Sequence, residues 1–475
     1  MARLLFLQNL QYEFLGPMYI AAAARRRGHS CRLVIGNTVE EFHPAIEAFR
    51  PDLIGFSIMT GSHRWALNIA REAKRRYDLP NIFGGPHPTF FPKFLNEDGV
   101  DMIMKGEGEE AICEVLDAID ANKQVSSIKN LGFKRNDVSR VNDLRNLPGD
   151  LDVYPFPDRD LYRALDGKLD RSIQNVLTSR GCPFHCSFCF EDAMRDMYKG
   201  KGKYVRLRQI SKVIEECVEL KAKTNPRMIY FADDLFGMDK KWLYEFVEIF
   251  RKEVGLRFIC LVRADIVASD PQYARKLADG GCENVFFGVE SGNEALRNKV
   301  LVKKTTNQEI YDAARLLHDA GIKFRTYNIM GLPGETLADA LSTVQINIDI
   351  KTDFPWCSIF SPIPGVALTD QAIEQGYLSP DFNTSDINQS FFLDNSLKLE
   401  NKQEIQNLQK FFQTAVQFPW SFPLIKLLIR LPPNVFFRLW FGFMYFVNYV
   451  RSEKKSLLLT LKFAMKNWRY VLAKQ

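Results

Sequence analysis

Two successive series of short apolar runs, each run followed by a segment with helical spacing, constrain the fold of this chain most strongly. In the first series, which ends near residue 121, the runs of strand length are Leu4–Leu7, Cys31–Ile35, Leu53–Ile58, Asn81–Gly84 and Val100–Met104. The helical segments between and after them are 17–27, 39–49, 64–77 and 109–121. Strands that alternate with helices predict a parallel, doubly wound α/β sheet. We therefore expect a first domain over residues 1–121.

The second series begins at Ile173 after a short, polar, turn-rich stretch. Its apolar runs are Ile173–Leu177, Met228–Phe231, Arg257–Val262, Asn284–Gly288, Phe324–Met330 and Cys357–Phe360, with helical segments between them. Six strand–helix units predict a partial (β/α)6 barrel, whose functional residues gather at the carboxyl ends of the strands. The expected organisation is a connector over 122–172, the barrel over 173–375, and a helical, basic and apolar region over 376–475.

Three cysteines follow the first strand of the predicted barrel, at Cys182, Cys186 and Cys189. This spacing places three thiolates around one small volume, where they can hold three corners of a cubane iron–sulfur cluster. The fourth iron then has no protein ligand and is open to chemistry. One alternative is a zinc site with His185, but zinc sites usually join two separated ligand pairs. Another alternative is three unrelated buried cysteines.

Glycine-rich and polar turns follow the strands of the first domain, at Ser57–Gly61, Gly84–Thr89 and Lys105–Glu110. Ligands of doubly wound sheets bind past the carboxyl ends of the strands. Glycine lets the backbone approach such a ligand closely, and Ser, Thr and Glu supply hydrogen bonds.

The cysteine spacing resembles the signature of the radical S-adenosylmethionine (SAM) superfamily. The first domain looks like the Rossmann-like cobalamin-binding domain that precedes many radical SAM cores. The Phe14-Leu15-Gly16-Pro17 helix start, the Gly-Gly-x-His-x-Thr turn and the Gly-Glu-Gly-Glu turn carry this second resemblance. Together they imply a cobalamin-dependent radical SAM enzyme with three cofactors: a 4Fe-4S cluster on Cys182, Cys186 and Cys189, SAM, and cobalamin.

The resemblance also implies which residues bind the cofactors. For SAM they are Phe188, Asp233, Asp234, Arg263, Glu290, Ser291 and Gly331. For cobalamin they are Leu15, Gly16, Ser57, Thr60, Gly84, Gly85, His87, Glu107, Gly108 and Glu109. Helix capping is the alternative role for Asp234 and Ser291, and a structural turn is the alternative for His87. None of the six histidines lies in an Asp-x-His-x-x-Gly motif, which predicts a cobalt without a histidine lower ligand. No catalytic base is identified.

Methylation of an unreactive carbon is the most common chemistry of the subgroup. A 5′-deoxyadenosyl radical removes a substrate hydrogen, and the substrate radical takes a methyl group from methylcobalamin. Relatives of this kind also perform oxidative cyclisation or ring formation, which stays open here. An RNA-modifying methylthiotransferase carries a second cysteine set in its first domain, where this chain has Cys31 and Cys113. A non-catalytic cobalamin sensor is the last alternative, and it has no need of the cysteine triad.

Charge separates the tail from the rest of the chain. The net charge of +6 divides into +9 from Gln417 onward and −3 before it, which argues against nucleic acid as a partner of the core. Nine cysteines without a pairing pattern favour a reducing compartment, the cytoplasm. Aromatic-rich segments flanked by Lys and Arg in 418–475 predict either an interfacial position at the inner membrane face or a lid on the barrel. A membrane-facing tail favours a lipid, isoprenoid or tetrapyrrole-like small-molecule substrate, and a natural product is the alternative substrate class. The resemblance also implies a low-potential electron donor such as flavodoxin or ferredoxin.

Overall fold

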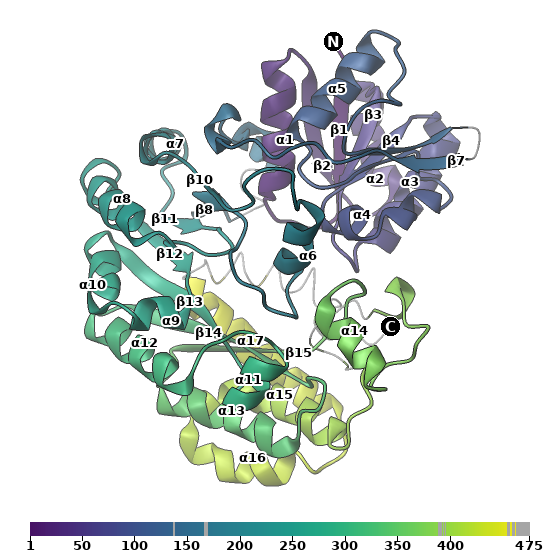
Figure 1. Cartoon of the computed structure of the whole chain (residues 1–475). Helices are drawn as coiled ribbons and strands as arrows, with labels where there is room; N and C mark the ends of the chain where they lie inside the picture. The colour runs from purple at the N-terminus through teal and green to yellow at the C-terminus, as the bar shows by residue number, and fades with distance from the viewer. Residues whose placement is uncertain are drawn as a thin grey trace. The chain divides into compact units, whose positions relative to one another are not determined.

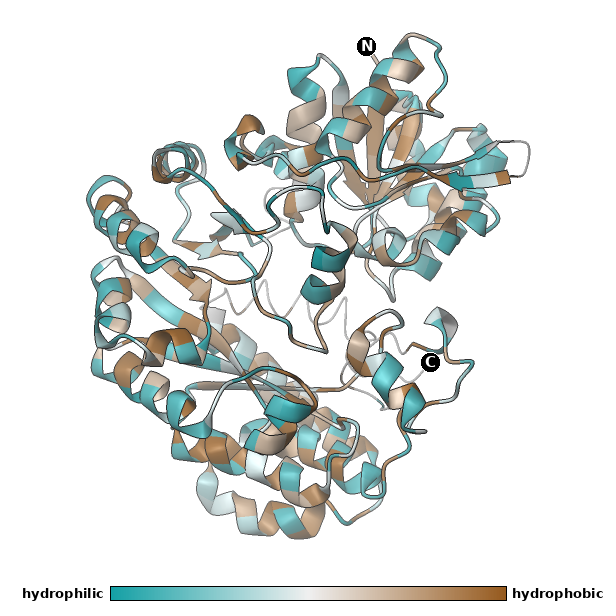
Figure 2. Cartoon of the chain, in the orientation of Figure 1, coloured by the Kyte–Doolittle hydropathy of each residue, from teal (hydrophilic) through white to brown (hydrophobic). Residues whose placement is uncertain are grey.

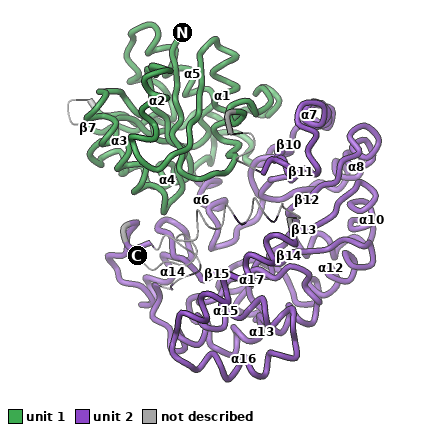
Figure 3. The backbone as a smooth tube through the Cα atoms, turned by 180° about the vertical axis from the view of Figure 1, so that it is seen from behind, with its two compact units in different colours: residues 1–169, 197–204 green, residues 170–196, 205–475 purple. Residues whose placement is uncertain are grey.

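The computed structural model describes residues 1–135, 138–165, 170–387 and 396–453, together with residues 392, 394, 457 and 461. It divides into two compact units, drawn in different colours in Figure 3. Unit 1 comprises residues 1–169 and 197–204, and unit 2 comprises residues 170–196 and 205–475. The predicted basic positions from Lys454 to Lys474 lie outside the described residues.

Unit 1 is a three-layer α/β domain (Figure 1). Its sheet has the strand order β2-β1-β3-β4-β5-β6-β7, parallel from β2 to β5 and antiparallel thereafter. The strands are β1 (Arg3–Gln8), β2 (Ser30–Ile35), β3 (Leu53–Ser57), β4 (Asn81–Gly84), β5 (Met102–Met104), β6 (Leu131–Arg135) and β7 (Val138–Val141). The order reverses between β1 and β3, so the crevice above these two strands is the expected ligand position.

The helices of unit 1 cover both faces of this sheet. They are α1 (Leu15–Arg26), α2 (Val39–Phe49), α3 (His63–Tyr77), α4 (Pro86–Phe90) and α5 (Glu109–Asp120), with short 3-10 turns η1 (Pro92–Asn96), η2 (Leu151–Val153) and η3 (Arg159–Leu165). One buried cluster packs α1 and α5 on the sheet, and a second packs α2 and α3 on its other face. The predicted doubly wound sheet is confirmed. Strands β6 and β7 come from the predicted connector, and the domain boundaries themselves stay a prediction.

Unit 2 is built on a six-stranded, all-parallel sheet of order β15-β14-β13-β12-β11-β8. Its strands are β8 (Ile173–Val176), β11 (Met228–Phe231), β12 (Arg257–Leu261), β13 (Cys282–Glu290), β14 (Lys323–Met330) and β15 (Phe354–Ile359). A two-stranded pair, β9 (Ser179–Arg180) with β10 (Arg206–Leu207), closes the base of the cysteine loop. Six parallel strands in chain order confirm the predicted partial barrel.

Helices cover the outer face of the barrel strands in the order that a βα repeat requires. They are α7 (Ile210–Thr224), α8 (Lys240–Glu253), α9 (Ala264–Ala268), α10 (Pro271–Asp279), α12 (Asn307–Asp319) and α13 (Leu337–Asp349). Their apolar side chains form a large buried cluster together with alternate residues of β11, β12 and β13. Two further short helices, α6 (Phe190–Met197) after the cysteine loop and α11 (Glu294–Lys299) after β13, contribute no residue to this cluster. In Figure 2 the strands are mostly brown, whereas the outer helices alternate between brown and teal.

The C-terminal region is helical, as expected from the sequence. It comprises α14 (Ala367–Glu374), η4 (Thr384–Asp386), α15 (Lys402–Gln417), η5 (Pro419–Ser421), α16 (Phe422–Leu428) and α17 (Val435–Glu453). Helix α15 is buried along nearly its whole length between α13, β15 and α17. Near its end α17 reaches the sheet, where Asn284 and Arg325 both bond to Ser452. No helix among the described residues is long and apolar enough to cross a membrane.

Candidate active site

The cysteine loop lies at the carboxyl end of β8, between β9 and α6. Cys182, Cys186 and Cys189 are free thiols with intermediate exposure, and the Cys189 N–H donates to the carbonyl of Cys186 at 3.1 Å. No three His, Cys, Asp or Glu side chains within the described ranges already converge as a metal site. Burial raises the pKa of Cys182 to about 11 and that of Cys189 to about 12. Three free thiols on one turn fit the donor set of a cubane cluster, and a bound metal would deprotonate them.

Two residues, Ser187 and Arg195, anchor this loop through hydrogen bonds to backbone carbonyls. Ser187 donates its hydroxyl to the carbonyl of Val300 at 2.6 Å, and its N–H to that of Leu301 at 3.1 Å. Arg195 on α6 donates to the carbonyls of Cys182 and Phe184, both at 3.1 Å. His185, the alternative zinc ligand, is largely exposed, and its Nδ1 lies 2.7 Å from the carboxylate of Asp192. Its ring is engaged by acidic and basic partners on α6.

Asp233 and Asp234, which follow β11, hold the beginning of the cysteine loop. The Asp233 carboxylate is buried and accepts the N–H groups of Thr178 at 2.7 Å and Ser179 at 3.2 Å. Desolvation raises the pKa of Asp233 to about 6, although these hydrogen bonds oppose the shift. Desolvation also raises the pKa of Asp234, and a backbone hydrogen bond from Gly181 opposes it. Both carboxylates therefore shape the loop, and their contact with SAM stays a prediction.

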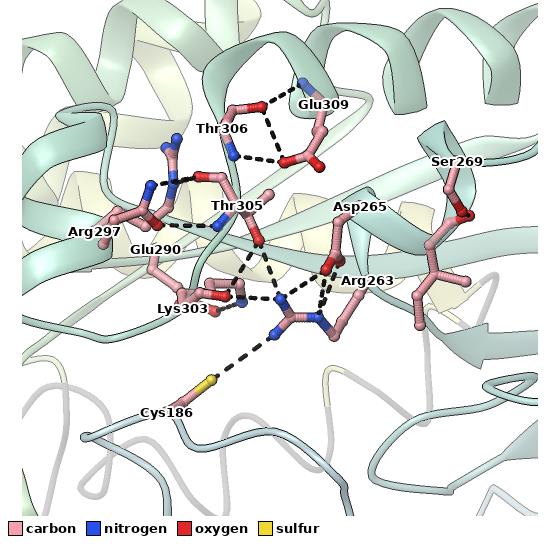
Figure 4. A network of polar contacts seen from close by, with 12 residues as sticks. Cys186, Arg263, Asp265, Ser269, Glu290, Arg297, Lys303, Thr305, Thr306 and Glu309 are labelled. Atoms are coloured by element: carbon pink, nitrogen blue, oxygen red, sulfur yellow. Dashed lines mark hydrogen bonds and ion pairs between the residues drawn. The ribbon is translucent and has the colours of Figure 1, made fainter.

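Arg263 is the centre of a buried polar network at the end of β12 (Figure 4). Its guanidinium forms two bonds of 2.9 Å to the carboxylate of Asp265 and one of 2.7 Å to the carbonyl of Lys303. It also lies 3.6 Å from the centre of the Phe184 ring and donates to Cys186 Sγ at 3.8 Å. Arg263 therefore places a positive charge beside the sulfur of Cys186.

Glu290 and Lys303 form a buried ion pair at the end of β13. Lys303 Nζ lies 2.7 Å from Glu290 Oε1, and both side chains are about 8% exposed. Glu290 has φ = +64°, a left-handed backbone conformation that is uncommon for non-glycine residues. A Cβ on Gly288 would stand 1.7 Å from Glu290 Oε1, so glycine is required beneath the folded-back carboxylate. This buried carboxylate and ammonium could pair with a ligand that itself carries both a positive and a negative group.

The remaining predicted SAM residues surround the same strand ends. Ser291 is fully buried, and its carbonyl accepts a 2.7 Å bond from Arg297. Gly331, at φ = +80°, donates its N–H to the carboxylate of Glu335. Burial raises the pKa of Glu335 to about 8. Phe188 packs in an apolar cluster that includes Leu332, and its contact with adenine stays a prediction.

In unit 1 the predicted cobalamin residues meet at the carboxyl ends of four strands. Leu15 and Gly16 begin α1 after β1, and a Cβ on Gly16 would lie 3.9 Å from Ser57 Oγ at the end of β3. These residues therefore flank the point where the strand order reverses. Gly84 pairs with Ser57 in the sheet register and continues the same edge. This position fits a large ligand that lies across the strand ends.

The Gly-Gly turn after β4 is shaped by close backbone contact. Gly85 has φ = +93°, and a Cβ there would stand 2.8 Å from the carbonyl oxygen of Ile58. The next residues bring His87 to Thr60, with His87 Nδ1 and Thr60 Oγ1 3.1 Å apart. His87 also stacks on His63, with ring centres 4.1 Å apart. Burial lowers the pKa of His87 to about 3 and that of His63 to about 4, so both rings are neutral at pH 7.

The turn after β5 is built around a tyrosine that lies far along the chain. The Glu107 N–H donates to the hydroxyl oxygen of Tyr198 at 2.9 Å, and the Glu107 carbonyl accepts from Asn130 at 2.9 Å. A Cβ on Gly106 would stand 2.0 Å from Tyr198 Oη. Gly108 and Glu109, the next predicted residues, are buried at the start of α5. Here the glycine is needed because Tyr198 of unit 1 occupies the space beside it.

Sequence reasoning missed four residues of these sites: His63, Tyr198, Lys303 and Glu335. The Gly-Leu-Pro-Gly-Glu-Thr run was a local signal for Glu335. The others reach their partners through tertiary contacts, which a single sequence does not display.

Two protein-family models match separate segments of the chain. Residues 10–116 match the B12 binding domain, and residues 176–346 match the radical SAM superfamily. The first match covers the turns after β1, β3, β4 and β5, and the second covers the cysteine loop, Arg263, Glu290 and Gly331.

Three curated relatives span most of the same region. An uncharacterized methyltransferase of Pyrococcus horikoshii is 29% identical over 77% of this chain and 79% of its own length. The anaerobic magnesium-protoporphyrin IX monomethyl ester cyclase of Rubrivivax gelatinosus is 25% identical over 68% of this chain and 59% of the cyclase. A hopanoid C-3 methylase of Methylococcus capsulatus is 26% identical over 65% of this chain and 59% of the methylase.

Two solved structures share the fold. OxsB, a cobalamin-dependent SAM radical enzyme solved with aqua-cobalamin and SAM, superposes with a TM-score of 0.70 at 14% identity, over 99% of this chain and 79% of its own. The radical SAM methyltransferase TsrM of Kitasatospora setae, solved with tryptophan and aza-SAM, gives 0.65 at 18% identity, over 79% and 76%. The cofactors of the present chain are accordingly a 4Fe-4S cluster, SAM and cobalamin. The chain therefore carries a B12 binding domain followed by a radical SAM domain, and it shares its fold with solved cobalamin-dependent radical SAM enzymes.

Proposed function

We propose that this enzyme is a C-methyltransferase that acts on a hydrophobic small molecule. The observation that carries the proposal is one chain with a B12 binding domain and a radical SAM domain, similar to the Pyrococcus methyltransferase over three quarters of its length. When bound, the cluster supplies the electron that cleaves SAM, and cobalamin supplies the methyl group.

The residues of the chain have distinct roles in this proposal. Cys182, Cys186 and Cys189 hold the cluster, and Arg263 keeps a positive charge at Cys186. The Glu290–Lys303 pair presents opposite charges to the amino-acid part of SAM. Asp233 and Asp234 orient the loop through Thr178 and Gly181.

In unit 1 the predicted cobalamin residues offer shape and neutral hydrogen-bonding groups. Gly16 lies beside Ser57 at the strand ends, and Gly85 lets the next turn pack against the Ile58 backbone. The neutral His87 lies beside Thr60. A low-potential donor such as flavodoxin or ferredoxin completes the system. The names of the hopanoid methylase and of a bacteriochlorophyllide d C-8(2)-methyltransferase among the relatives support a lipid-like or tetrapyrrole-like substrate. The composition of the tail supports a cytoplasmic enzyme held at the inner membrane face.

A second candidate is oxidative cyclisation with the same cofactors. Relatives named as magnesium-protoporphyrin IX monomethyl ester cyclase favour it. A putative methylthiotransferase of Methanocaldococcus jannaschii is also similar, at 26% identity over 75% of this chain. The first domain of the present chain has Cys31 and Cys113 and no second cysteine set of the kind expected in an RNA-modifying methylthiotransferase.

Labelled SAM separates these candidates. The reconstituted enzyme is incubated under reducing, anaerobic conditions with methyl-deuterated SAM and with hopanoid, isoprenoid and tetrapyrrole substrates in turn. Methyl transfer predicts a product heavier by the labelled methyl group, together with 5′-deoxyadenosine and S-adenosylhomocysteine. An unlabelled product formed with 5′-deoxyadenosine alone would reject methyl transfer and support cyclisation.

A further inference from the structure

The segment from Phe418 to Phe443 exposes an unusual number of large apolar side chains. Ten of the exposed large apolar residues in the described part of the chain lie here: Phe418, Trp420, Leu424, Leu427, Leu431, Val435, Phe436, Leu439, Trp440 and Phe443. Trp420 is 80% exposed and Phe436 is 74% exposed, so most of each of these two residues is in contact with solvent. A concentration of this kind marks an interaction surface on a folded protein. We call these ten residues the outer apolar face.

The outer apolar face is additional to the packing that holds these helices in place. Helix α16 packs inward through Phe422 and Ile425, which join the core formed by α13, α15 and β15. Leu424 and Leu427 are exposed on its other side, and Leu431 is exposed just after the helix ends. Brown segments mark α16 in Figure 2.

Helix α17 has the same two-sided character. It buries Phe441 and Met444, whereas Phe436, Leu439, Trp440 and Phe443 are exposed at the i, i+3, i+4, i+7 spacing of one helical face. The Trp440 indole donates to the hydroxyl of Thr414 on α15 at 2.8 Å, which fixes this helix beside α15. An exposed apolar stripe on a helix that already has an inner apolar side is not required by the fold.

The charge around the outer apolar face identifies what it binds. Residues 417–452 contain Lys426, Arg430, Arg438 and Arg451 and no Asp or Glu. Lys426 and Arg430 are exposed on the same segment as the three leucines. Each basic residue near an anionic lipid surface strengthens binding about fivefold. Pairing two copies of this chain through the face would instead bring four positive charges against four.

We propose that the outer apolar face docks the enzyme on an anionic lipid surface, with α16 and α17 lying in the interface. Helices with apolar aromatic side chains on one side and Lys and Arg nearby bind in this position without crossing the bilayer. Trp420 and Trp440 suit the headgroup level, where indole rings are enriched. This inference rests on the proposed membrane position and not on methyl transfer. A negative result in the vesicle experiment below would therefore leave the labelled-SAM test of methyl transfer unaffected, and the reverse also holds.

Vesicle flotation with the full-length holoenzyme tests the proposal. The probes are vesicles of phosphatidylcholine alone and of phosphatidylcholine with phosphatidylglycerol, each at low and high salt. We expect flotation with the anionic vesicles at low salt and at least about a tenfold weaker affinity at high salt. The apolar variant Leu427→Gln/Phe436→Gln and the charge variant Lys426→Gln/Arg430→Gln should each weaken binding at least about tenfold.

The matched control is Val138→Gln, because Val138 is a 68% exposed apolar residue on β7 of unit 1. It should float as the wild type does, and all variants should retain iron, cobalamin and their far-UV spectrum. Wild-type protein that ignores anionic vesicles, or apolar variants that float like the wild type, would overturn the proposal. A third outcome would also overturn it: a wild-type dimer that becomes a monomer in the apolar variants while flotation is unchanged. The outer apolar face would then pair two copies of the chain.

Discussion

The cofactor sites of the two units are built by different means. In unit 2 the strand ends carry buried charged groups that are paired with one another, such as Arg263 with Asp265 and Glu290 with Lys303. In unit 1 the equivalent edge is shaped by glycine turns and by two stacked histidines whose low pKa values keep them neutral. SAM carries a carboxylate, an ammonium and a sulfonium, whereas cobalamin is a large, mostly neutral, amide-rimmed molecule. From this comparison we infer that the site in unit 2 selects its ligand by charge and the site in unit 1 by shape.

The largest expected effect is on the charge-selecting side, at the cluster itself. Cys182→Ala removes one of three thiolates, and the remaining two cannot hold a cubane with one open iron. We expect iron content and 5′-deoxyadenosine formation to fall below detection while cobalamin still binds. Cys217→Ala is the control, because Cys217 is a buried thiol on α7, within the apolar core. Retained deoxyadenosine formation in Cys182→Ala would place the cluster elsewhere.

The next effect concerns the Glu290–Lys303 pair. Lys303→Ala leaves a buried carboxylate unpaired, which destabilises the fold by about 3–5 kcal/mol in urea unfolding. The double variant Glu290→Gln/Lys303→Met leaves no buried charge, so it should lose far less stability while still losing SAM affinity. Lys223→Ala breaks the exposed pair with Glu219 and should change stability by less than about 1 kcal/mol. Equal losses in the single and double variants would show that charge pairing is not what Lys303 provides.

On the shape-selecting side, Gly85→Ala and Gly28→Ala form a matched pair. Both glycines have a left-handed φ, +93° and +87°, but a Cβ on Gly28 meets nothing within 4 Å whereas one on Gly85 meets the Ile58 carbonyl at 2.8 Å. Gly28→Ala therefore costs about 1–2 kcal/mol of backbone strain. Gly85→Ala adds about 1–3 kcal/mol of steric overlap and should also weaken cobalamin binding, measured by absorbance titration. Equal losses of stability and of cobalamin affinity in the two variants would show that close packing against Ile58 does not shape the cobalamin site.

Much of this arrangement could be predicted from the sequence because its signals are local. The apolar runs predicted β1 to β5 of unit 1 and all six strands of the unit 2 sheet, although β6 and β7 were missed. Ser57, Arg263 and Glu290 lie at or just after the strand ends, as expected. The partners of those residues could not be predicted in the same way. Lys303 reaches Glu290 across a left-handed turn, and Tyr198 reaches Glu107 from 91 residues away. Such contacts depend on tertiary packing and produce no periodic pattern in the sequence.

Acidification should affect the shape-selecting side through its neutral histidines. The folded pKa of His87 lies near 3, below the ordinary 6.5, so the stability that its neutral form contributes is present above pH 6.5 and is lost as pH falls toward the folded pKa. At about pH 5 this loss amounts to about 2 kcal/mol. His87→Asn should remove that part of the pH dependence in urea unfolding.

The smallest expected effect tests whether Tyr198 is part of the cobalamin turn. Tyr198→Phe removes the hydroxyl that accepts the Glu107 N–H, which costs about 0.5–1.5 kcal/mol. Cobalamin affinity should weaken by a similar free energy while iron content is unchanged. Tyr311→Phe, which removes an exposed hydroxyl bonded to Asp349, should leave both stability and cobalamin affinity unchanged.

A double-mutant cycle separates a shaped turn from a lost hydrogen bond. A Cβ on Gly106 would overlap Tyr198 Oη, so Gly106→Ala should be strongly destabilising in the wild-type chain. In the Tyr198→Ala background the same substitution meets open space, and its destabilisation should fall to that of left-handed backbone strain alone, about 1–2 kcal/mol. Such non-additivity would establish that Gly106 is required by Tyr198 rather than by cobalamin. Additive effects would mean that the glycine serves the ligand directly, and the turn after β5 would then join the turns after β1 and β4 as part of the cobalamin surface.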